Sequence, residues 1–360
     1  MKQTYAVNLK PGQPVETTFL VQTKERKIAR NGKAYLDLEL KDSTGVIRAK
    51  LWDCDRLPHD FEVDDVVRVE GQVEDFQGTA QLRMAAISRC ADAVDLLDYL
   101  PRTAADPEQM YAALLARIRS MADGPVTQLL FAVLEDPVIA EKFKRAPAAM
   151  TYHHAYLGGL LEHVSSLVQL GDQICDHYPS LRRDLLLAGV VLHDLGKIEE
   201  LTFSRGFRYT TRGQLLGHMT IALEIVGQKM RSIPDFPPAL KDQLEHIIIS
   251  HHGQLEFGSP KLPLFPEALV LHYLDDLDAK LDCMRAIVEQ DRQIEGHWTS
   301  YNTALERMVL KKLKYLAEGA EDQAEAAPEV QPSPVQTGSE PVSLFGEKLS
   351  RALDGSLEEE

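Results

Sequence analysis

The segment VVLHDLGKIEE, residues 190–200, joins an apolar run to three side chains that could do chemistry. The run predicts a buried helix, and His193, Asp194 and Lys197 come at its end. Burying an imidazole, a carboxylate and an ammonium group costs several kcal/mol unless the groups pair or bind a metal. The segment therefore predicts a metal or ion-pair site at the end of a core helix.

Four further stretches place histidine or aspartate in apolar, helical surroundings: LLEHVSSL with His163, LLGHMTIA with His218, IIISHHGQ with His251 and His252, and LHYLDDLDAK with Asp275 and Asp276. Each stretch alone is more typical of a core histidine than of a metal ligand. His193 and Asp194 would lie ~100° apart on a helix, so they can share an ion only if other helices supply the remaining ligands. Imidazole and carboxylate groups without thiolate suit Mn, Fe, Ni, Co or Zn rather than Ca.

Residues 1–95 have a different pattern, with five alternating or β-branched segments separated by turn signals. These segments are FLVQTKERK, KAYLDLELKD, GVIRAKLWD, DVVRVEGQVEDF and TAQLRMAAISR. Five short strands in about 80 residues predict a small closed β-barrel of the OB-fold type.

The second and third segments predict a hairpin with its turn at residues 42–45. Pairing then sets Tyr35 opposite Trp52, with Arg48 and Lys50 on the same face, while the alternate residues form the core. Exposed aromatic rings beside cations form a stacking platform for unpaired bases, worth ~1–3 kcal/mol per base. Two alternatives remain open: the charges form cross-strand ion pairs, and the two rings are buried against the helical domain.

A basic segment precedes this hairpin, because residues 24–33 hold five bases and one acid. Lys24, Arg26 and Lys27 are its candidates for contact with phosphates. Solvated loop charge is the alternative interpretation.

The rest of the chain predicts helices. We expect a helical linker at 96–150 that packs on an all-α domain at 151–317, with a hairpin or long loop at 201–213. Asp106-Pro107 is a typical helix start. Residues 318–360 are rich in Pro, Ala, Glu and Gln, which predicts an acidic disordered tail. Its stretch VSLFGEKLSRAL could bind an unidentified protein.

The net charge of −16 argues only weakly against a nucleic-acid partner, because the tail carries −9 of it and the remaining body −7. No apolar run approaches the ~20 residues of a membrane span, and the N-terminus has no apolar signal core. We therefore expect a cytoplasmic protein with no membrane partner. The four cysteines form no CxxC pair, which favours packing roles over disulfides or zinc ligands.

Taken in order, these residues read H…HD…H…HH…D. This series resembles the signature of the HD-domain metal-dependent phosphohydrolases, an all-helical superfamily. The stretches YHHAYLGGLLEH, GQLLGH, SHHGQLEFGSPKLP and LDDLDAK, behind an OB-like N-terminus, narrow the resemblance to the YhaM-type 3′→5′ exoribonucleases over residues 12 to about 315. The acidic tail lies outside the resemblance.

The resemblance implies two metal positions that share Asp194. One would be held by His163, His193, Asp194 and Asp275, and the second by His218, His251 and His252. Leu274 replaces the alanine that usually precedes the last aspartate, so Asp276 and Asp278 stay open as alternatives to Asp275. Mn²⁺ is the favoured ion, with Co²⁺, Fe²⁺, Ni²⁺, Zn²⁺ and Mg²⁺ as alternatives and one or two ions per site.

The implied activity is metal-dependent 3′→5′ hydrolysis of single-stranded RNA, with single-stranded DNA as a second candidate substrate. A bound ion lowers the pKa of water toward ~7, which activates it at neutral pH. Asp194 and Lys197 are the candidate catalytic residues, and the lysine would neutralise a phosphate oxygen or protonate the leaving group. A favourable interaction with a helix C-terminus is the alternative role for Lys197.

Three further residues are candidates for holding the strand near the scissile phosphate: His153, His154 and Lys261. Structural roles are equally open for them. Two other functions also compete, namely a small-nucleotide phosphohydrolase regulated by the barrel and a non-catalytic single-strand-binding protein. The barrel with its basic segment argues against the first, and the complete ligand set argues against the second. Assembly into a homo-oligomer stays open.

Overall fold

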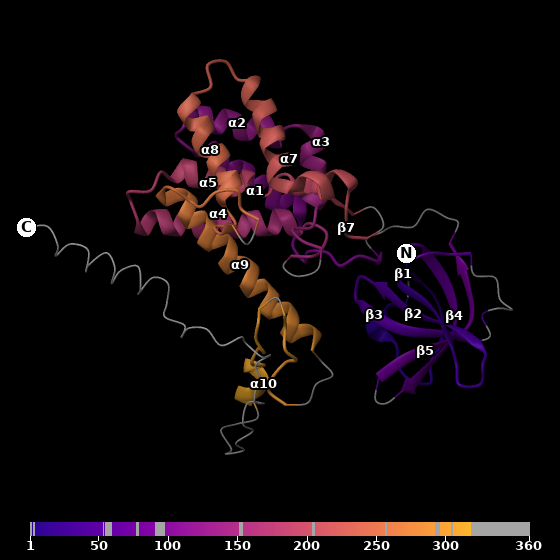
Figure 1. The fold of residues 1–360 in the computed structure, drawn as a ribbon. Coiled ribbons are helices and arrows are strands. Elements are labelled where there is room, and N and C mark those ends of the chain that lie inside the picture. Colours follow the sequence, from indigo (N-terminus) through magenta and orange to yellow (C-terminus); the bar gives the residue numbers. More distant parts are fainter. Residues whose placement is uncertain are drawn as a thin grey trace, which may run out of the picture.

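The computed structural model describes residues 2, 4–52, 54, 60–76, 79–90, 98–150, 154–203, 206–255, 258–291, 296–303 and 305–317. The N-terminal strands form a barrel, and the helices gather into a bundle beside it (Figure 1). The tail predicted for residues 318–360 lies outside the described residues.

Five strands form the closed barrel in the order β1-β2-β3-β5-β4. They are β1 (Pro14–Ile28), β2 (Ala34–Asp42), β3 (Gly45–Trp52), β4 (Val66–Phe76) and β5 (Thr79–Arg89), preceded by the short 3-10 helix η1 (Ala6–Asn8). The first half of β1 pairs with β4 and its second half with β2, which closes the barrel. The predicted five-stranded OB barrel is confirmed, although β1 begins at Pro14, earlier than the predicted segment.

The register of the β2–β3 hairpin matches the prediction. Tyr35 lies opposite Trp52, and Asp37 lies opposite Lys50. Alternate residues on the other face of both strands are buried, and they are Leu36, Leu38, Leu40, Ile47, Ala49 and Leu51. The alternation therefore separates a core face from an outward face on which the aromatic and basic side chains lie.

The helical part contains ten helices within the described ranges: α1 (Pro107–Arg119), α2 (Gly124–Leu134), α3 (Pro137–Arg145), α4 (Gly159–His177), α5 (Arg183–Leu192), α6 (Lys197–Glu200), α7 (Thr211–Arg231), α8 (Pro238–Ser250), α9 (Pro266–Gln290) and α10 (Lys312–Ala317). The first three begin alike, because Asp106, Asp123 and Asp136 each accept a hydrogen bond from a first-turn N–H group. A proline follows each aspartate in the first turn, where its missing N–H costs nothing.

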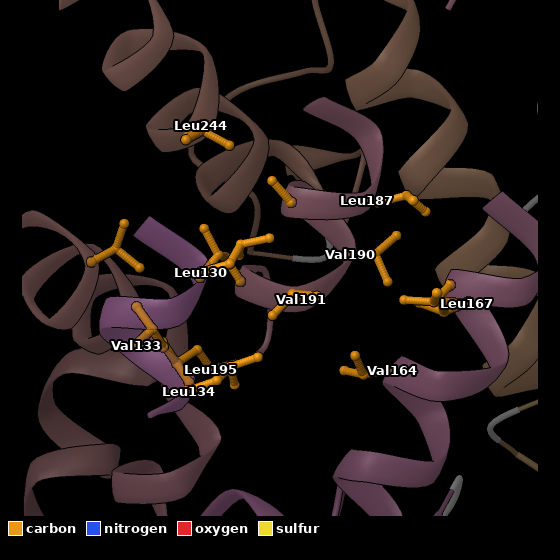
Figure 2. Close-up of a cluster of buried hydrophobic side chains, with 14 of the residues drawn as sticks. Leu130, Val133, Leu134, Val164, Leu167, Leu187, Val190, Val191, Leu195 and Leu244 are labelled. Carbon is orange, nitrogen blue, oxygen red and sulfur yellow. The ribbon is translucent and has the colours of Figure 1, made fainter. Parts of the chain in front are cut away.

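Helix α5 lies at the centre of the bundle. Its residues Leu185–Leu192 are all buried. Figure 2 shows Val190 and Val191 of α5 in one apolar cluster with Val164 of α4 and Val133 of α2. Helices α1, α2 and α3 contribute to the same apolar cluster as α4 to α9. The apolar run that precedes His193 is therefore a core helix.

A small hairpin between α6 and α7 contacts the barrel. Strands β6 (Leu201–Thr202) and β7 (Arg208–Tyr209) pair within the segment predicted as a hairpin or loop. Arg208 lies 2.6 Å from Asp64 of the barrel. An apolar cluster also crosses the junction and contains Leu20, Val66, Tyr99, Leu100 and Leu157, with Phe203 and Phe207 packed against it.

The prediction of nearly continuous helix up to residue 317 is wrong for residues 296–303 and 305–311. This stretch instead forms isolated bridges, of which one joins Trp298 to Leu310. The hydroxyl of Thr299 accepts a hydrogen bond from the backbone N–H of Val309, and such local bonds compete with helix formation. Among the described residues, no helix has both the length and the apolar character needed to cross a bilayer.

Candidate metal centre and nucleic-acid interface

Five helices deliver the predicted histidines and aspartates to one place. His193 caps the C-terminus of α5, with Asp194 next to it, and His251 caps the C-terminus of α8. His163 lies within α4, and Asp275 lies within α9. His218 comes from α7. His163 and Asp275, which are more than 100 positions apart in the chain, thus lie 3.2 Å from each other.

Asp194 lies between two groups of histidines. Its Oδ2 atom is 3.4 Å from Nε2 of His193 and 3.9 Å from Nε2 of His163. Its Oδ1 atom is 3.5 Å from Nε2 of His218 and 3.8 Å from Nε2 of His251. On the Oδ2 side, Oδ1 of Asp275 lies 3.2 Å from Nε2 of His163. One carboxylate thus faces both groups, one group with each oxygen.

Two glycines permit this convergence. Gly217 has φ +70° and ψ 157°, which interrupts α7 and turns His218 toward Asp194. Gly196, in the HDLGK motif, has a different role. A Cβ atom on Gly196 would lie 1.9 Å from the carbonyl oxygen of His218, so only glycine allows α6 to approach α7 this closely.

Several buried polar atoms of this cluster form no hydrogen bond with the described residues. They are Nε2 of His193, His218 and His251, together with Oδ1 of Asp194. Leaving such atoms unsatisfied costs about 1–3 kcal/mol each. Imidazole nitrogens and carboxylate oxygens that face one point are the donor set of a divalent transition metal. The donor atoms of His163, His193 and Asp275 lie within 4.8 Å of one another, as do those of His218, His251 and His252. The residues present therefore fit a metal centre.

The charges in the cluster are set by burial and by the neighbouring groups. Burial opposes ionisation of Asp194, but Lys197 and His193 outweigh it and hold the pKa of its carboxyl well below the usual range. Burial, together with the nearby His193, lowers the pKa of His251 well below its usual value, so this ring is neutral and able to bind a cation. Burial would also lower the pKa of His163, but Asp275 and Asp278 raise it to about 9.

Lys197 lies inside this cluster. Its Nζ atom is 2.5 Å from Oδ2 of Asp194, and its side chain is largely buried. Burial favours the neutral amine, but Asp194 and Asp275 outweigh that effect and raise the pKa of Lys197. The residue therefore carries a buried positive charge next to the shared aspartate.

The three aspartates of LDDLDAK have separate environments. Asp275 faces the histidines, whereas Asp276 lies on the outer side of α9 and pairs with Lys280 at 2.7 Å. Asp278 lies behind the cluster and accepts a hydrogen bond from Nδ1 of His163 at 2.8 Å. Of the three, only Asp275 is in position to be a ligand of the first group.

The residues expected to hold the strand near the scissile phosphate are placed differently. His154 is buried, and its Nε2 atom lies 2.9 Å from Oδ2 of Asp278, so its ring contacts the cluster from behind. His153 lies outside the described residues. Lys261 is exposed in the loop after α8, where its carbonyl oxygen accepts a hydrogen bond from Ser259.

On the barrel, aromatic rings surround a lysine. The ring centroids of Tyr35 and Trp52 lie 4.7 Å apart. Nζ of Lys50 lies 5.8 Å and 5.9 Å from these two centroids and 5.1 Å from that of Phe76. Trp52 is 39% exposed and Phe76 is 52% exposed, which argues against burial of this face under the helices.

A groove of about 420 Å³ runs beside these rings. Arg48 and Lys50 line it, and neither forms an ion pair with the described residues. The acidic residues Asp37 and Glu39 line it as well. Asp37 binds Lys27 at 2.7 Å, so the cross-strand pairing with Lys50 does not occupy the Lys50 charge.

The basic segment at the end of β1 contributes less free charge than its composition indicates. Nζ of Lys24 contacts the carbonyl oxygen of Phe61 and, at 3.2 Å, the carboxylate of Glu62. Lys27 is paired with Glu25 as well as with Asp37. Arg26 is exposed on the same strand.

Two functional residues, Glu200 and Phe76, have no signal in the sequence pattern, and a third, Asp278, is predicted only as an alternative ligand. Glu200, which ends α6, lies 3.2 Å from Nδ1 of His218. Asp278 was considered only as a ligand, although its position one turn after Asp275 places it on the same side of α9. Phe76 ends β4 next to a predicted turn, and no local pattern relates it to β2 and β3.

Two domain families match this chain. Residues 160–280 match the HD domain family, and residues 20–88 match the family described as an OB-fold nucleic acid binding domain. A solved second OB-fold domain of replication protein A from Methanococcus maripaludis has 21% identity and a TM-score of 0.21, covering 26% of this chain and 98% of that one. An OB domain from Methanosarcina mazei has 18% identity and a TM-score of 0.23, covering 27% of this chain and 91% of that one.

Two curated relatives match almost the whole chain. The protein named 3′-5′ exoribonuclease YhaM from Geobacillus sp. (strain WCH70) is 36% identical over 313 residues, or 85% of this chain and 94% of that protein. The protein of the same name from Bacillus velezensis (strain DSM 23117 / BGSC 10A6 / LMG 26770 / FZB42) is 36% identical over 307 residues, or 84% and 95%. With this identity over most of both chains, the chain belongs to the YhaM family.

Proposed function

We propose that this protein is a metal-dependent 3′→5′ exoribonuclease that hydrolyses single-stranded RNA. The observation that carries the proposal is that buried imidazole nitrogens without a hydrogen bond surround the carboxylate of Asp194. The chain that places them there is related over most of its length to 3′-5′ exoribonucleases. Single-stranded DNA is a second candidate substrate, because a stacking face accepts the bases of either polymer.

We assign two metal positions to the cluster. His163, His193 and Asp275 would hold the first ion with Oδ2 of Asp194, and His218, His251 and His252 would hold the second with Oδ1. Mn²⁺ is our choice of ion among Mn, Fe, Ni, Co and Zn, all of which suit a donor set of imidazoles and carboxylates without thiolate. When bound, such ions supply an activated water and stabilise negative charge at phosphorus.

The protein's own contribution to the reaction is to fix the geometry and charge of this site. Lys197 holds Asp194 in place and sets a positive charge beside it, where it would also offset charge on the scissile phosphate. Residues 98–150 share the core of the helices that carry the ligands, and we propose that they form part of the hydrolase domain.

The barrel would hold the strand at nucleotides beyond the terminal one. Trp52 and Phe76 offer exposed rings, and the half-buried ring of Tyr35 lies against Trp52, so bases of any sequence can stack on this face. Arg48 and Lys50 would contact the backbone phosphates, since neither forms an ion pair with an acid among the described residues. A base held by stacking needs no specific hydrogen bond, which suits an enzyme that degrades RNAs of many sequences.

The proposal is tested with a 5′-labelled single-stranded RNA and purified protein. With Mn²⁺ we expect a ladder that shortens from the 3′ end, and with a chelator we expect none. A second strand that carries a 3′ phosphorothioate linkage should resist degradation, whereas the same linkage at the 5′ end should not protect it. Hydrolysis of small nucleotides without any polymer degradation would instead support a nucleotide phosphohydrolase. A mobility shift without cleavage would support a binding protein.

A further inference from the structure

The four central histidines of the cluster are held from behind in two different ways. Nδ1–H of His193 donates to the carbonyl oxygen of Val190, and Nδ1–H of His251 donates to that of Ile248, both at 2.8 Å. These partners are neutral backbone groups within the helix that each histidine ends. They fix the orientation of the ring and leave its Nε2 atom facing Asp194.

His163 is held by a carboxylate instead. Oδ2 of Asp278 lies 2.8 Å from Nδ1 of His163 and 2.9 Å from Nε2 of His154. Its other oxygen accepts a hydrogen bond of 2.6 Å from the hydroxyl of Ser166. Three partners from two segments thus fix this carboxylate, and it in turn fixes the ring of His163.

His218 also has a carboxylate behind it. Oε1 of Glu200 lies 3.2 Å from Nδ1 of His218 and accepts a hydrogen bond of 2.9 Å from its backbone N–H. This contact holds the first residue after the break at Gly217, where α7 has no continuous helical ladder to fix the chain. Glu200 therefore fixes both the backbone and the ring of His218.

Each of the two groups contains one histidine backed by a carboxylate and one backed by a carbonyl, and the second group also contains His252. The first group contains His163, backed by Asp278, and His193, backed by a carbonyl. The second contains His218, backed by Glu200, and His251, backed by a carbonyl. A carboxylate behind a ligating imidazole fixes its tautomer and raises its basicity, and losing such a partner weakens metal binding about 10- to 100-fold.

From this arrangement we infer that Asp278 and Glu200 are positioning residues that set the metal affinity of the two halves of the centre separately. Asp278 acts on the ion held by His163, and Glu200 acts on the ion held by His218. The inference rests on the proposed dinuclear site. It predicts that the affinity for either ion can be lowered without changing the affinity for the other, although both positions share Asp194.

The test measures Mn²⁺ binding by the full-length protein, using calorimetry and the metal content after dialysis against a graded chelator. Asp278→Asn should lower the affinity for one of the two Mn²⁺ ions by about 10- to 100-fold and leave the affinity for the other nearly unchanged. Glu200→Gln should lower the affinity for the other ion in the same way, and the double variant should lower the affinity for both ions. Asp276→Asn is the matched control, because this neighbouring acid pairs with Lys280 on the outer side of α9.

Electron paramagnetic resonance separates positioning from general support of the fold. Two neighbouring Mn²⁺ ions give a coupled signal, and each single variant at limiting Mn²⁺ should give the signal of an isolated ion. Ser166→Ala removes one hydrogen-bond partner of Asp278 and leaves His163 in place. It should lower the affinity for the same ion as Asp278→Asn does, but by less. Asp278→Ala, which keeps no acceptor for His163, should weaken it more than Asp278→Asn.

Three results would overturn the inference. One is unchanged Mn²⁺ affinity in both variants. Another is equal weakening of both ions together with a lower melting temperature of the metal-free protein, which would assign Asp278 and Glu200 to structural support alone. The third is a wild-type protein that degrades RNA with one ion. A wild-type protein that binds no divalent metal would overturn the proposed function as well.

Discussion

The histidine cluster and the aromatic groove of the barrel arrange charge in opposite ways. In the cluster, every acid faces a base, and Asp194 is held between Lys197 and two groups of histidines. In the groove, Arg48 and Lys50 form no ion pair with the described residues, and the rings of Trp52 and Phe76 beside them are exposed. The first arrangement is specific for a small ion at one point, whereas the second can accept a flexible polymer in many positions.

The difference follows from how each region is built. The cluster needs the ends or breaks of several helices to meet, so its geometry is set before any ligand arrives. The groove lies on the outer face of the barrel and is lined by residues of all five strands, so the strand register places its side chains. We therefore expect substitutions in the cluster to abolish the reaction and substitutions in the groove to change affinity by degrees.

The largest effect should come from Asp194→Ala. Both groups of histidines lose their shared carboxylate, so we expect kcat to fall by at least about 100- to 1000-fold, the usual loss when a group that stabilises the transition state is removed. Most of the affinity for a single strand should remain, because the barrel is untouched. Turnover, bound metal and fluorescence anisotropy with labelled RNA are measured together. Asp276→Ala is the control, and full activity in Asp194→Ala would refute the two-metal assignment.

The next effect concerns the aromatic face. Trp52→Ala should weaken binding of a long single strand roughly 5- to 150-fold, the equivalent of one lost stacked base. Phe76→Ala should have a similar but separate effect. Hydrolysis of a dinucleotide should be unaffected, because the metal centre needs only the terminal phosphate.

Val46→Ala is the matched control for the aromatic variants, since Val46 is an exposed apolar residue at the other end of the same strand pair. The measurements are KM and kcat on the long and short substrates, with the melting temperature of each variant. An equal loss on both substrates together with a lower melting temperature would mean that Trp52 supports the fold rather than the strand.

A smaller effect is expected for the two groove cations. Each phosphate contact that is lost should reduce the slope of log K against log salt by about 0.7 for a single strand. Arg48→Ala and Lys50→Ala should each lower this slope, and the double variant should lower it about twice as much. Lys280→Ala on α9 serves as the control for a change of net charge. An unchanged slope in the double variant would remove both residues from the interface.

The smallest effect belongs to an ion pair outside both regions. Asp136 caps α3 and binds Lys229 of α7 at 2.8 Å, and Lys229 with the first-turn N–H of Ile139 lowers the pKa of its carboxyl. Asp136→Ala should cost about 0.5–2 kcal/mol of folding free energy at pH 7, as for other lost helix caps. RNA binding and kcat should not change.

The pH dependence of this loss has a definite sign. Because the folded-state pKa of Asp136 is lower than the unfolded value of 3.8, its stabilisation is complete well above pH 3.8 and is lost as the pH falls through the folded-state pKa. Urea unfolding at pH 7 and at successively lower pH should show the wild type and Asp136→Ala converging. A constant difference down to the lowest pH would show that the carboxylate charge is not involved.

Local sequence patterns determine the strand faces, the hairpin register and several helix starts of this protein. The alternation of Leu36, Leu38 and Leu40 against polar neighbours defines the core face of β2, and the turn at 42–45 then sets the register that pairs Tyr35 with Trp52. Asp106-Pro107 marks the start of α1 because the cap and the proline act within one turn. The apolar run before His193 predicts a core helix for the same reason, since burial of each turn depends on residues three or four positions apart.

Only the tertiary structure decided which acids serve the cluster and how. Asp275, Asp276 and Asp278 look alike in sequence, and their roles differ because α9 turns each one toward a different neighbour. The same holds for Glu200 and for Phe76, whose partners lie on other helices or strands. Sequence periodicity reports which face of an element is buried. It does not report which elements cross at that face, because that depends on the packing of the whole core around α5.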